Sequence, residues 1–150
     1  MTTHKLVSKF YGRVWNAGDR AALDDLLSDS FTFQGSLSPE VAGREAFWQM
    51  VTMVRGALSS YHCEILDCVS EDASAFAKMR FSGQHTGPFR GYAPTGLMAA
   101  WHGAALFHFD GNRIGKIWVL SDTAALDAVL AANAEAARGG AVTARSLQIR

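Results

Sequence analysis

Two titratable side chains stand where predicted strands end, and both residue types carry acid–base chemistry in enzymes. His85 lies near the start of the segment GQHTGPFRGYAPTG (residues 83–96), whose Gly and Pro residues predict a long irregular loop. Asp122 follows the apolar segment 114–121. Histidine titrates near neutral pH, and a carboxyl group held against indole and aliphatic side chains loses hydration and can then donate a proton. The two residues are therefore candidates for an acid–base pair.

Alternation along a strand predicts which way each side chain points. Met79, Phe81 and His85 share one face of the strand before the loop, so His85 is expected to face inward. Trp118 and Asp122 share a face of the last strand, so Asp122 faces inward if Trp118 does. Each residue also has a structural interpretation, which the residues alone leave open. Asp122 is a favoured type of helix N-cap, and His85 is equally compatible with a hydrogen-bonded polar residue in a turn.

The elements that would position these residues change in type along the chain. Apolar residues at helical spacing predict three helices in the first half, over residues 6–15, 22–27 and 44–56. Between the last two of these, a short strand at 31–33 and a loop at 36–39 are expected. Segments rich in aromatic and aliphatic residues then predict four strands, over 61–69, 73–84, 97–109 and 114–121, and a final helix over 123–137.

Helices followed by a strand meander indicate an α+β fold in one domain spanning residues 1–150. One curved antiparallel sheet would wrap around the N-terminal helices, and an apolar pocket would form between sheet and helices. The core is expected to cover about residues 5–130. A C-terminal tail over about 138–150 shows no clear period.

The charge balance limits the expected binding partners, and the two cysteines indicate the cellular compartment. The chain has 14 Lys and Arg against 14 Asp and Glu, so bulk electrostatic capture of nucleic acid or an anionic membrane is not expected. No apolar run is long enough to span a membrane, and the N-terminus lacks the apolar core of a secretory signal. Cys63 and Cys68, five residues apart, fall on opposite faces of a regular strand. They are predicted to be half-buried free thiols of a cytoplasmic protein.

The sequence shows no motif for a metal, a nucleotide phosphate or a nucleophilic serine, so we expect neither metal nor organic cofactor. The chain is instead rich in large aromatic residues for its length, and part of this set should line a pocket for an apolar ligand. The candidate substrate-binding residues are Trp15, Phe47, Trp48, Val51, Met79, Phe81, Trp101 and Trp118.

Three segments of the chain resemble the SnoaL-like polyketide cyclases of the nuclear transport factor 2-like superfamily. Residues 83–96 match the signature G-x-H-x-G-x-F-x-G-x-x-P-T-G, with His85 as its histidine. Residues 109–122 are similar to the ending F-x-D or D-G-x-I followed by W-x-x-x-D, which supplies Trp118 and Asp122. Residues 10–19 fit the first helix and turn of the superfamily, and together the similarity covers about residues 5–130.

The resemblance implies a cone-shaped α+β barrel that is open at one end to an apolar cavity. It also implies a cofactor-free enzyme that cyclises or isomerises an apolar carbonyl compound by aldol-type chemistry. In that scheme Asp122 is the acid/base and His85 assists it. A positioned acid–base pair suffices for this chemistry, because the carbon between two carbonyl groups is already acidic.

Two alternatives remain open from the sequence. The first is a non-catalytic protein of the same fold that binds a small molecule. The second is an epoxide hydrolase, which would need an Asp-Arg-Asp relay built from Asp122, Arg80 and either Glu64 or Asp67. A homodimer is also expected, and an apolar sheet face that includes Ile117 and Val119 would permit it.

Overall fold

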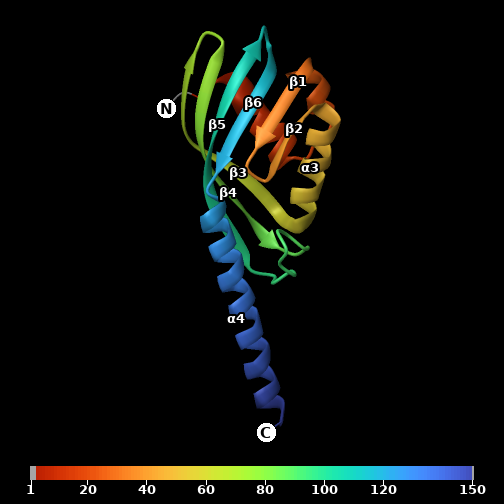
Figure 1. Ribbon diagram of the computed structural model, residues 1–150, viewed down its shortest axis with the longest axis vertical. Helices are drawn as coiled ribbons and strands as arrows, with labels where there is room; N and C mark the ends of the chain where they lie inside the picture. Colours follow the sequence, from red (N-terminus) through yellow and green to blue (C-terminus); the bar gives the residue numbers. More distant parts are fainter. Residues whose placement is uncertain (1–2, 150) are drawn as a thin grey trace.

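The computed structural model describes the backbone of residues 3–149 and their side chains except those of Pro39 and residues 140–149. Helices come first, strands follow, and one long helix ends the described chain (Figure 1). In chain order the elements are α1 (Lys5–Lys9), the π-helix η1 (Phe10–Asn16), α2 (Ala21–Leu26), β1 (Leu27–Gly35), β2 (Ser38–Ala42), α3 (Arg44–Ala57), β3 (Leu58–Glu71), β4 (Ser74–His85), β5 (Met98–Asp110), β6 (Arg113–Ser121) and α4 (Thr123–Ile149).

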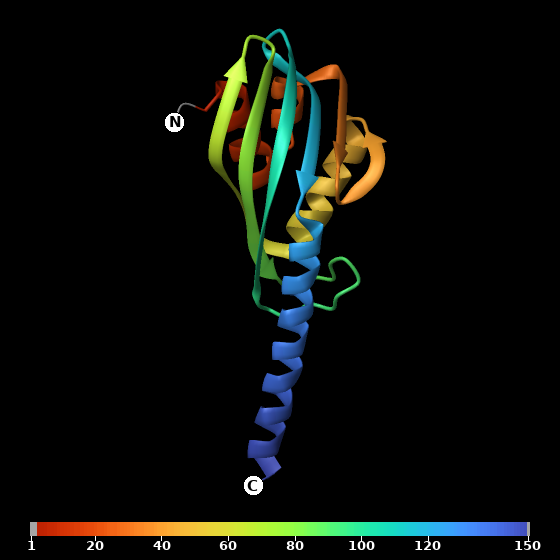
Figure 2. The same ribbon diagram turned by 60° about the vertical axis from the view of Figure 1, so that its left-hand side comes forward.

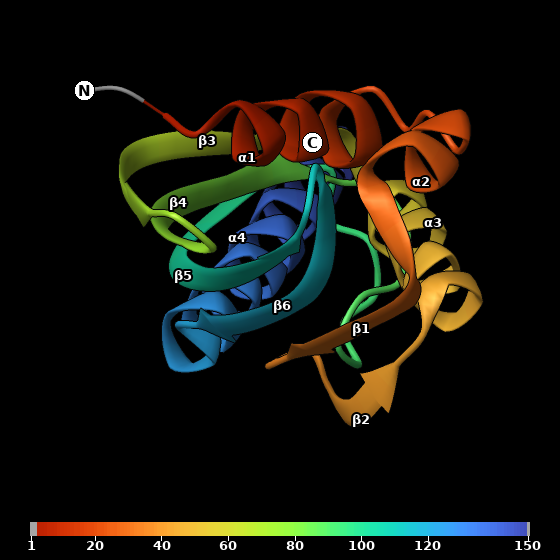
Figure 3. The same cartoon turned by 90° about the horizontal axis from the view of Figure 1, so that it is seen from above.

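The six strands form one curved, open sheet in the order β2-β1-β6-β5-β4-β3. All neighbours are antiparallel except β1 and β6, which pair in parallel and so depart from the expected antiparallel sheet. Seen along the long axis, β3–β6 curve beneath α1, while α3 lies on the side of β1 and β2 (Figure 3). The α+β fold with a curved sheet around N-terminal helices is therefore confirmed.

The core lies between the concave sheet face and the helices. Phe10 of η1 stacks on Phe47 of α3 and meets Phe107 of β5 edge-on, with ring centroids 5.8 Å apart in each pair. All three rings are fully or almost fully buried. Burial of such rings supplies most of the free energy that holds helices and sheet together.

Most of the predicted elements are present, with longer bounds. Gly18 has φ +65° and ends the first helical segment, and the carboxylate of Asp19 accepts a hydrogen bond from the backbone N–H of Ala21 at the start of α2. The expected loop at 36–39 is partly strand, because β2 begins at Ser38. The last helix does not end near Gly139 but continues to Ile149, away from the body of the protein (Figure 2). The side chains of residues 140–149, which belong to the predicted tail, lie outside the described residues.

Strand β4 keeps a strict alternation of buried and exposed residues. Its pairing with β5 runs without interruption from Ser74 opposite His108 to Gln84 opposite Met98. The predicted inward face of Met79, Phe81 and His85 is confirmed, because all three side chains are buried.

Strand β6 breaks the alternation at Gly115. His108 of β5 pairs with Lys116 and Phe109 pairs with Ile114, so Gly115 has no partner residue in β5 and forms a bulge. Ile114 and Ile117 consequently both face inward, although three residues separate them. The inward orientation expected for Trp118 is wrong, because beyond the bulge Trp118 lies on the outer face and is 38% exposed.

A second register shift, between Ile65 and Asp67 of β3, changes the predicted positions of the cysteines. The extra residue puts Cys63 and Cys68 on the same, inward face, so the expectation of opposite faces and half-burial is wrong. Both cysteines are buried, and neither is in a disulfide, so the prediction of free thiols is confirmed.

Candidate functional site

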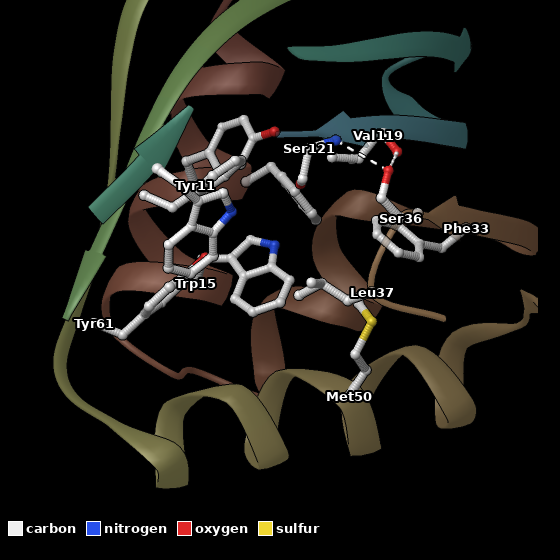
Figure 4. Close-up of a pocket in the computed structure, with 13 residues that line it drawn as sticks. Tyr11, Trp15, Phe33, Ser36, Leu37, Met50, Tyr61, Val119 and Ser121 are labelled. Atoms are coloured by element: carbon white, nitrogen blue, oxygen red, sulfur yellow. Dashed lines mark hydrogen bonds between the residues drawn. The ribbon is translucent and has the colours of Figure 1, made fainter. Parts of the chain in front are cut away.

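An aromatic pocket opens between the concave face of the sheet and the helices η1 and α3 (Figure 4). The space between its lining atoms, open solvent at the mouth included, is about 450 Å³, but the part that the centre of a water molecule can occupy is only about 30 Å³. Its aromatic walls are Phe10, Tyr11, Trp15, Phe33, Tyr61, Phe81 and Trp101. The remaining lining residues are Gly35, Ser36, Leu37, Met50, Val119 and Ser121.

The π-helix η1 supplies two of these walls. Its wider turn brings residues four and five apart onto one side, so Tyr11 and Trp15 face the pocket together. Asn16 fastens the end of η1 to β3, since its side-chain amide donates to the carbonyl of Cys63 at 3.1 Å and accepts from the N–H of Cys63 at 2.7 Å. As a result, the ring centroid of Trp15 lies 5.4 Å from that of Tyr61, which belongs to β3 as Cys63 does.

A serine bridge closes the opposite side of the pocket. The hydroxyl of Ser36 donates to the carbonyl of Val119 at 3.3 Å and accepts from the N–H of Ser121 at 3.0 Å, as the dashed lines in Figure 4 show. The turn between β1 and β2 is thereby fixed to the end of β6. Met50 of α3 and Leu37 lie beside this bridge, and Tyr61 faces them from across the pocket (Figure 4).

The two pocket phenols keep their protons at neutral pH. Burial raises the pKa of Tyr11 and Tyr61 well above the usual value near 10, and the neighbouring thiol of Cys63 adds to the effect. Burial also raises the pKa of Cys63 to about 12, although its hydrogen bond with Tyr61 acts in the opposite direction. The phenols therefore act as neutral hydrogen-bond donors and not as bases.

Trp101 brings a buried donor to the same pocket. Its side chain is 2% exposed, and its indole Nε1 has no hydrogen-bond partner among the described residues. Phe81, Phe89 and Tyr61 surround it, with ring centroids 5.5, 6.3 and 6.4 Å from the indole. Burying an N–H without a hydrogen-bond partner costs about 1–3 kcal/mol of free energy. A ligand oxygen that accepts a hydrogen bond from this N–H would recover part of that free energy on binding.

His85 faces inward but does not line the pocket. Its side chain is fully buried, its Nδ1 lies 3.3 Å from the hydroxyl of Thr95, and its Nε2 has no partner in the described part of the chain. Backbone bonds of His85 with Gly96 and Leu97 hold the two ends of the loop together. The loop thus returns over the histidine and shields it from solvent.

Asp122 lies outside the pocket, on the exposed side of the chain. Its carboxylate accepts a hydrogen bond from the backbone N–H of Ala125 at 3.0 Å, which makes it the N-cap of α4. The preceding residue, Ser121, does line the pocket. In this conformation Asp122 and His85 do not meet on one cavity.

The other predicted binding residues divide into three groups. Trp15, Phe81 and Trp101 line the pocket. Three belong to the solid core behind it and are fully buried: Phe47, Val51 and Met79. Two are elsewhere: Trp48 is half-buried with the guanidinium of Arg20 6.0 Å from its ring centroid, and Trp118 is on the outer face.

The relay needed for epoxide hydrolysis is not assembled in the pocket. Arg80 and Glu64 are opposite each other on the outer face of β4 and β3, and both are exposed. Asp67 is exposed as well.

Several lining residues were missed by the sequence reasoning. Tyr11 precedes Trp15 by four residues, a spacing that places both on one side of a helix and was a usable signal. Tyr61, Ser36 and Ser121 carried no comparable signal. Their positions depend on where strands bulge and where the β1–β2 turn meets β6.

Within the described residues, no group of three or more His, Cys, Asp or Glu side chains gathers as metal ligands would. Nor does any described helix combine the length and the apolar character needed to cross a bilayer.

Comparison with solved structures shows the same fold at low sequence identity. Wild-type IdmH of Streptomyces antibioticus, named as a candidate polyketide cyclase, aligns with a TM-score of 0.76 at 18% identity, covering 85% of this chain and 99% of that one. TsrD of Streptomyces laurentii aligns with a TM-score of 0.74 at 24% identity over 84% and 92%. AclR of Streptomyces galilaeus, named as a candidate hydroxylase, aligns with a TM-score of 0.74 at 17% identity over 84% and 82%.

These neighbours carry names of different activities, so they support the fold and not one reaction. No curated protein matches the sequence at a significant level. The sequence model of the SnoaL-like polyketide cyclases, in contrast, matches residues 5–130, which is most of the chain. The chain therefore belongs to the SnoaL-like polyketide cyclase family.

Proposed function

We propose that the aromatic pocket, once its lining side chains move apart, binds a neutral, largely flat small molecule that carries a carbonyl oxygen. The observation that carries this proposal is the chemistry of the lining. Among the described residues no Asp, Glu, Lys, Arg or His lines the pocket, and its polar side chains are hydroxyls and indole N–H groups. Aromatic walls favour a flat ligand, and buried donors favour an acceptor oxygen. A charged ligand would lose its hydration without gaining a counter-charge.

Binding can be tested with a fluorescent aryl ketone, 6-propionyl-2-dimethylaminonaphthalene, whose emission reports hydrogen bonding to its carbonyl. Tyr11→Phe removes one donor and keeps the ring, so we expect affinity to fall about five- to tenfold, in line with the loss of one hydrogen bond. Tyr92→Phe is the matched control, because Tyr92 is outside the pocket lining. Absence of saturable binding to the wild-type chain would reject the proposal.

A second candidate function is turnover of such a ligand by acid–base ring closure or isomerisation, without metal or cofactor. It is favoured by membership of the family and by the unpaired Nε2 of His85, a buried group that lacks its hydrogen bond. Asp122 would act as the acid/base only after its carboxylate leaves the N–H of Ala125 and turns toward the side of Ser121.

Enolisation of 2-tetralone in D₂O, followed by NMR, tests this step without knowledge of the natural substrate. A catalyst would accelerate exchange of the hydrogens next to the carbonyl, and Asp122→Asn should abolish the acceleration while keeping the helix cap. If the wild-type chain binds the ketone but exchange stays at the buffer rate, the chain is a binding protein and the second candidate is excluded.

The homodimer stays a prediction, but the surface expected for it is wrong. Ile117 is fully buried and Val119 lines the pocket, so neither faces a partner. An apolar row instead crosses the outer face of four neighbouring strands. Its members pair side by side in the order Val69, Phe76, Leu106 and Trp118.

We propose that a second copy of the chain packs on this outer row. The next row of outward residues has Lys116 at the β6 end and Glu71 at the β3 end. A two-fold axis parallel to the strands therefore puts Lys116 of each copy against Glu71 of the other.

Light scattering tests the dimer. We expect the wild-type chain to have the mass of a dimer and Phe76→Glu to have that of a monomer. Val41→Glu is a control at another exposed apolar residue, 61% exposed and outside the row. A monomeric wild-type chain would exclude this interface.

A further inference from the structure

A second hollow lies on the surface beside the aromatic pocket. It measures about 590 Å³, including open space, and is lined by Leu37, Met53, Pro88, Phe89 and Arg90. Three of these side chains are apolar and large, and Met53 is 49% exposed. An exposed methionine beside a buried phenylalanine offers an apolar contact surface that water does not satisfy.

Leu37 lines both this hollow and the aromatic pocket. The two spaces therefore meet at this side chain. A part of a ligand that extends from the pocket past Leu37 would lie over Met53 and Phe89.

The wall on the loop side is held in place by two contacts. Phe89 packs near the pocket indole of Trp101, with ring centroids 6.3 Å apart. Arg90 forms a two-pronged ion pair with Asp127 of α4, at 2.7 Å from Nε and 3.0 Å from Nη2. The loop after β4 is therefore fastened to the helix after β6.

We propose that the hollow is a second binding subsite, which holds an apolar chain attached to the flat carbonyl compound in the aromatic pocket. This inference rests on the proposed function, because the chain is part of the same ligand. The class of ligand that it assigns is an aryl or polycyclic ketone with an alkyl or acyl tail several carbons long.

Two fluorescent ketones that differ only in the tail test the subsite. The short one is the 6-propionyl naphthalene described above, and the long one is its 6-hexanoyl homologue. Each buried methylene strengthens binding by about fourfold at most, so three half-buried ones predict about tenfold tighter binding of the long ketone. Met53→Ser should reduce this preference to about twofold and leave the affinity for the short ketone unchanged.

Two further variants make the result specific. Met53→Leu should retain the preference, because it keeps an apolar side chain at the same place. Val41→Ser removes an exposed apolar side chain outside both cavities and should leave both affinities unchanged.

The possible outcomes separate the subsite from the pocket. If both ketones bind with equal affinity, the subsite is excluded and the pocket stands. If the long ketone is preferred but Met53→Ser does not change the preference, the tail lies elsewhere and the subsite is excluded. If neither ketone binds, the pocket proposal fails and the subsite fails with it.

Discussion

Of the two residues singled out for acid–base chemistry, His85 ends β4 and Asp122 directly follows β6. The two strands follow the alternation rule differently. In β4 every residue from Ser74 to Gln84 has a partner in β5, and His85 points inward, as its position relative to Met79 and Phe81 predicts. In β6 one unpaired residue, Gly115, reverses the faces of everything after it. Asp122 therefore lies on the exposed side of the chain.

The difference shows that alternation along a strand predicts the direction of a side chain only where the pairing with the neighbouring strand has no register shift. One extra residue in a strand moves the whole downstream set of side chains to the opposite face. In β6 the change removes Trp118 and Asp122 from the inner face and brings Val119 and Ser121 to the pocket.

The strongest test of this contrast is a pair of truncations, one on each strand. Met79→Ala in β4 leaves a cavity under a fully buried residue, so the free energy of unfolding should fall by about 2–5 kcal/mol. Trp118→Ala in β6 should cost about 1 kcal/mol or less in dilute solution, where a dimer does not form. Urea denaturation measures both, and a larger loss at Trp118 would contradict its outward position.

A second pair of variants concerns two glycines, Gly103 of β5 and Gly115 at the bulge of β6, which differ in the space around them. A Cβ at Gly103, between β4 and β6, would lie 2.6 Å from the ring of Phe81 and 2.9 Å from the carbonyl oxygen of Leu120. Gly103→Ala should therefore destabilise by about 1–3 kcal/mol.

At the bulge, a Cβ on Gly115 comes no closer than 3.4 Å to the side chain of Asp110. Gly115→Ala should change the free energy of unfolding by less than about 1 kcal/mol, because the pairing of β5 and β6 and not the flexibility of glycine makes the bulge. Thermal melts of the two alanine variants would show the difference, and equal losses would contradict it.

The cap at the end of β6 gives a smaller effect. Asp122→Ala should destabilise by about 1 kcal/mol, since the N–H of Ala125 loses its acceptor, whereas Asp122→Asn should be nearly neutral. Denaturant midpoints of the two variants measure this. If both variants were equally unstable, the carboxylate would have a structural role beyond the cap.

The smallest effect concerns the ion pair that links the loop after β4 with the helix after β6. The hydrogen bond from Arg90 lowers the pKa of Asp127 below the usual value near 4. The ion pair therefore stabilises the fold fully at a pH above the usual pKa, and this stabilisation disappears as the pH falls through the lowered pKa of Asp127. The melting temperatures of the wild-type chain and Arg90→Ala should differ slightly at neutral pH and converge in strong acid. A constant difference would assign the effect to lost packing of Arg90.

The order and type of the elements other than β2 were predictable from the sequence, because helical spacing in residues 6–56 and strand composition in residues 61–121 are local signals. The turn at Gly111, with φ +62°, and the end of the helix at Gly18 were equally local. The parallel contact of β1 with β6 was not predicted, since it joins segments that are far apart in the chain.

The pocket was predictable in kind but only partly in composition. Trp15, Phe81 and Trp101 were expected and do line it. Phe47 and Met79 have the same character but lie in the solid core, because which inward side chain meets a cavity depends on the curvature of the sheet. A resemblance in sequence motif likewise named Asp122 without indicating the face of the strand that it occupies.

By itself the sequence determined the fold class, the family and the aromatic character of the site, because these follow from composition, spacing and motif. The tertiary structure alone decided which polar groups the site presents. Register shifts in β3 and β6 and one serine bridge turned Ser121, Tyr61 and Cys63 inward and left Asp122 outside. Register is a property of paired strands, so no single strand encodes it completely.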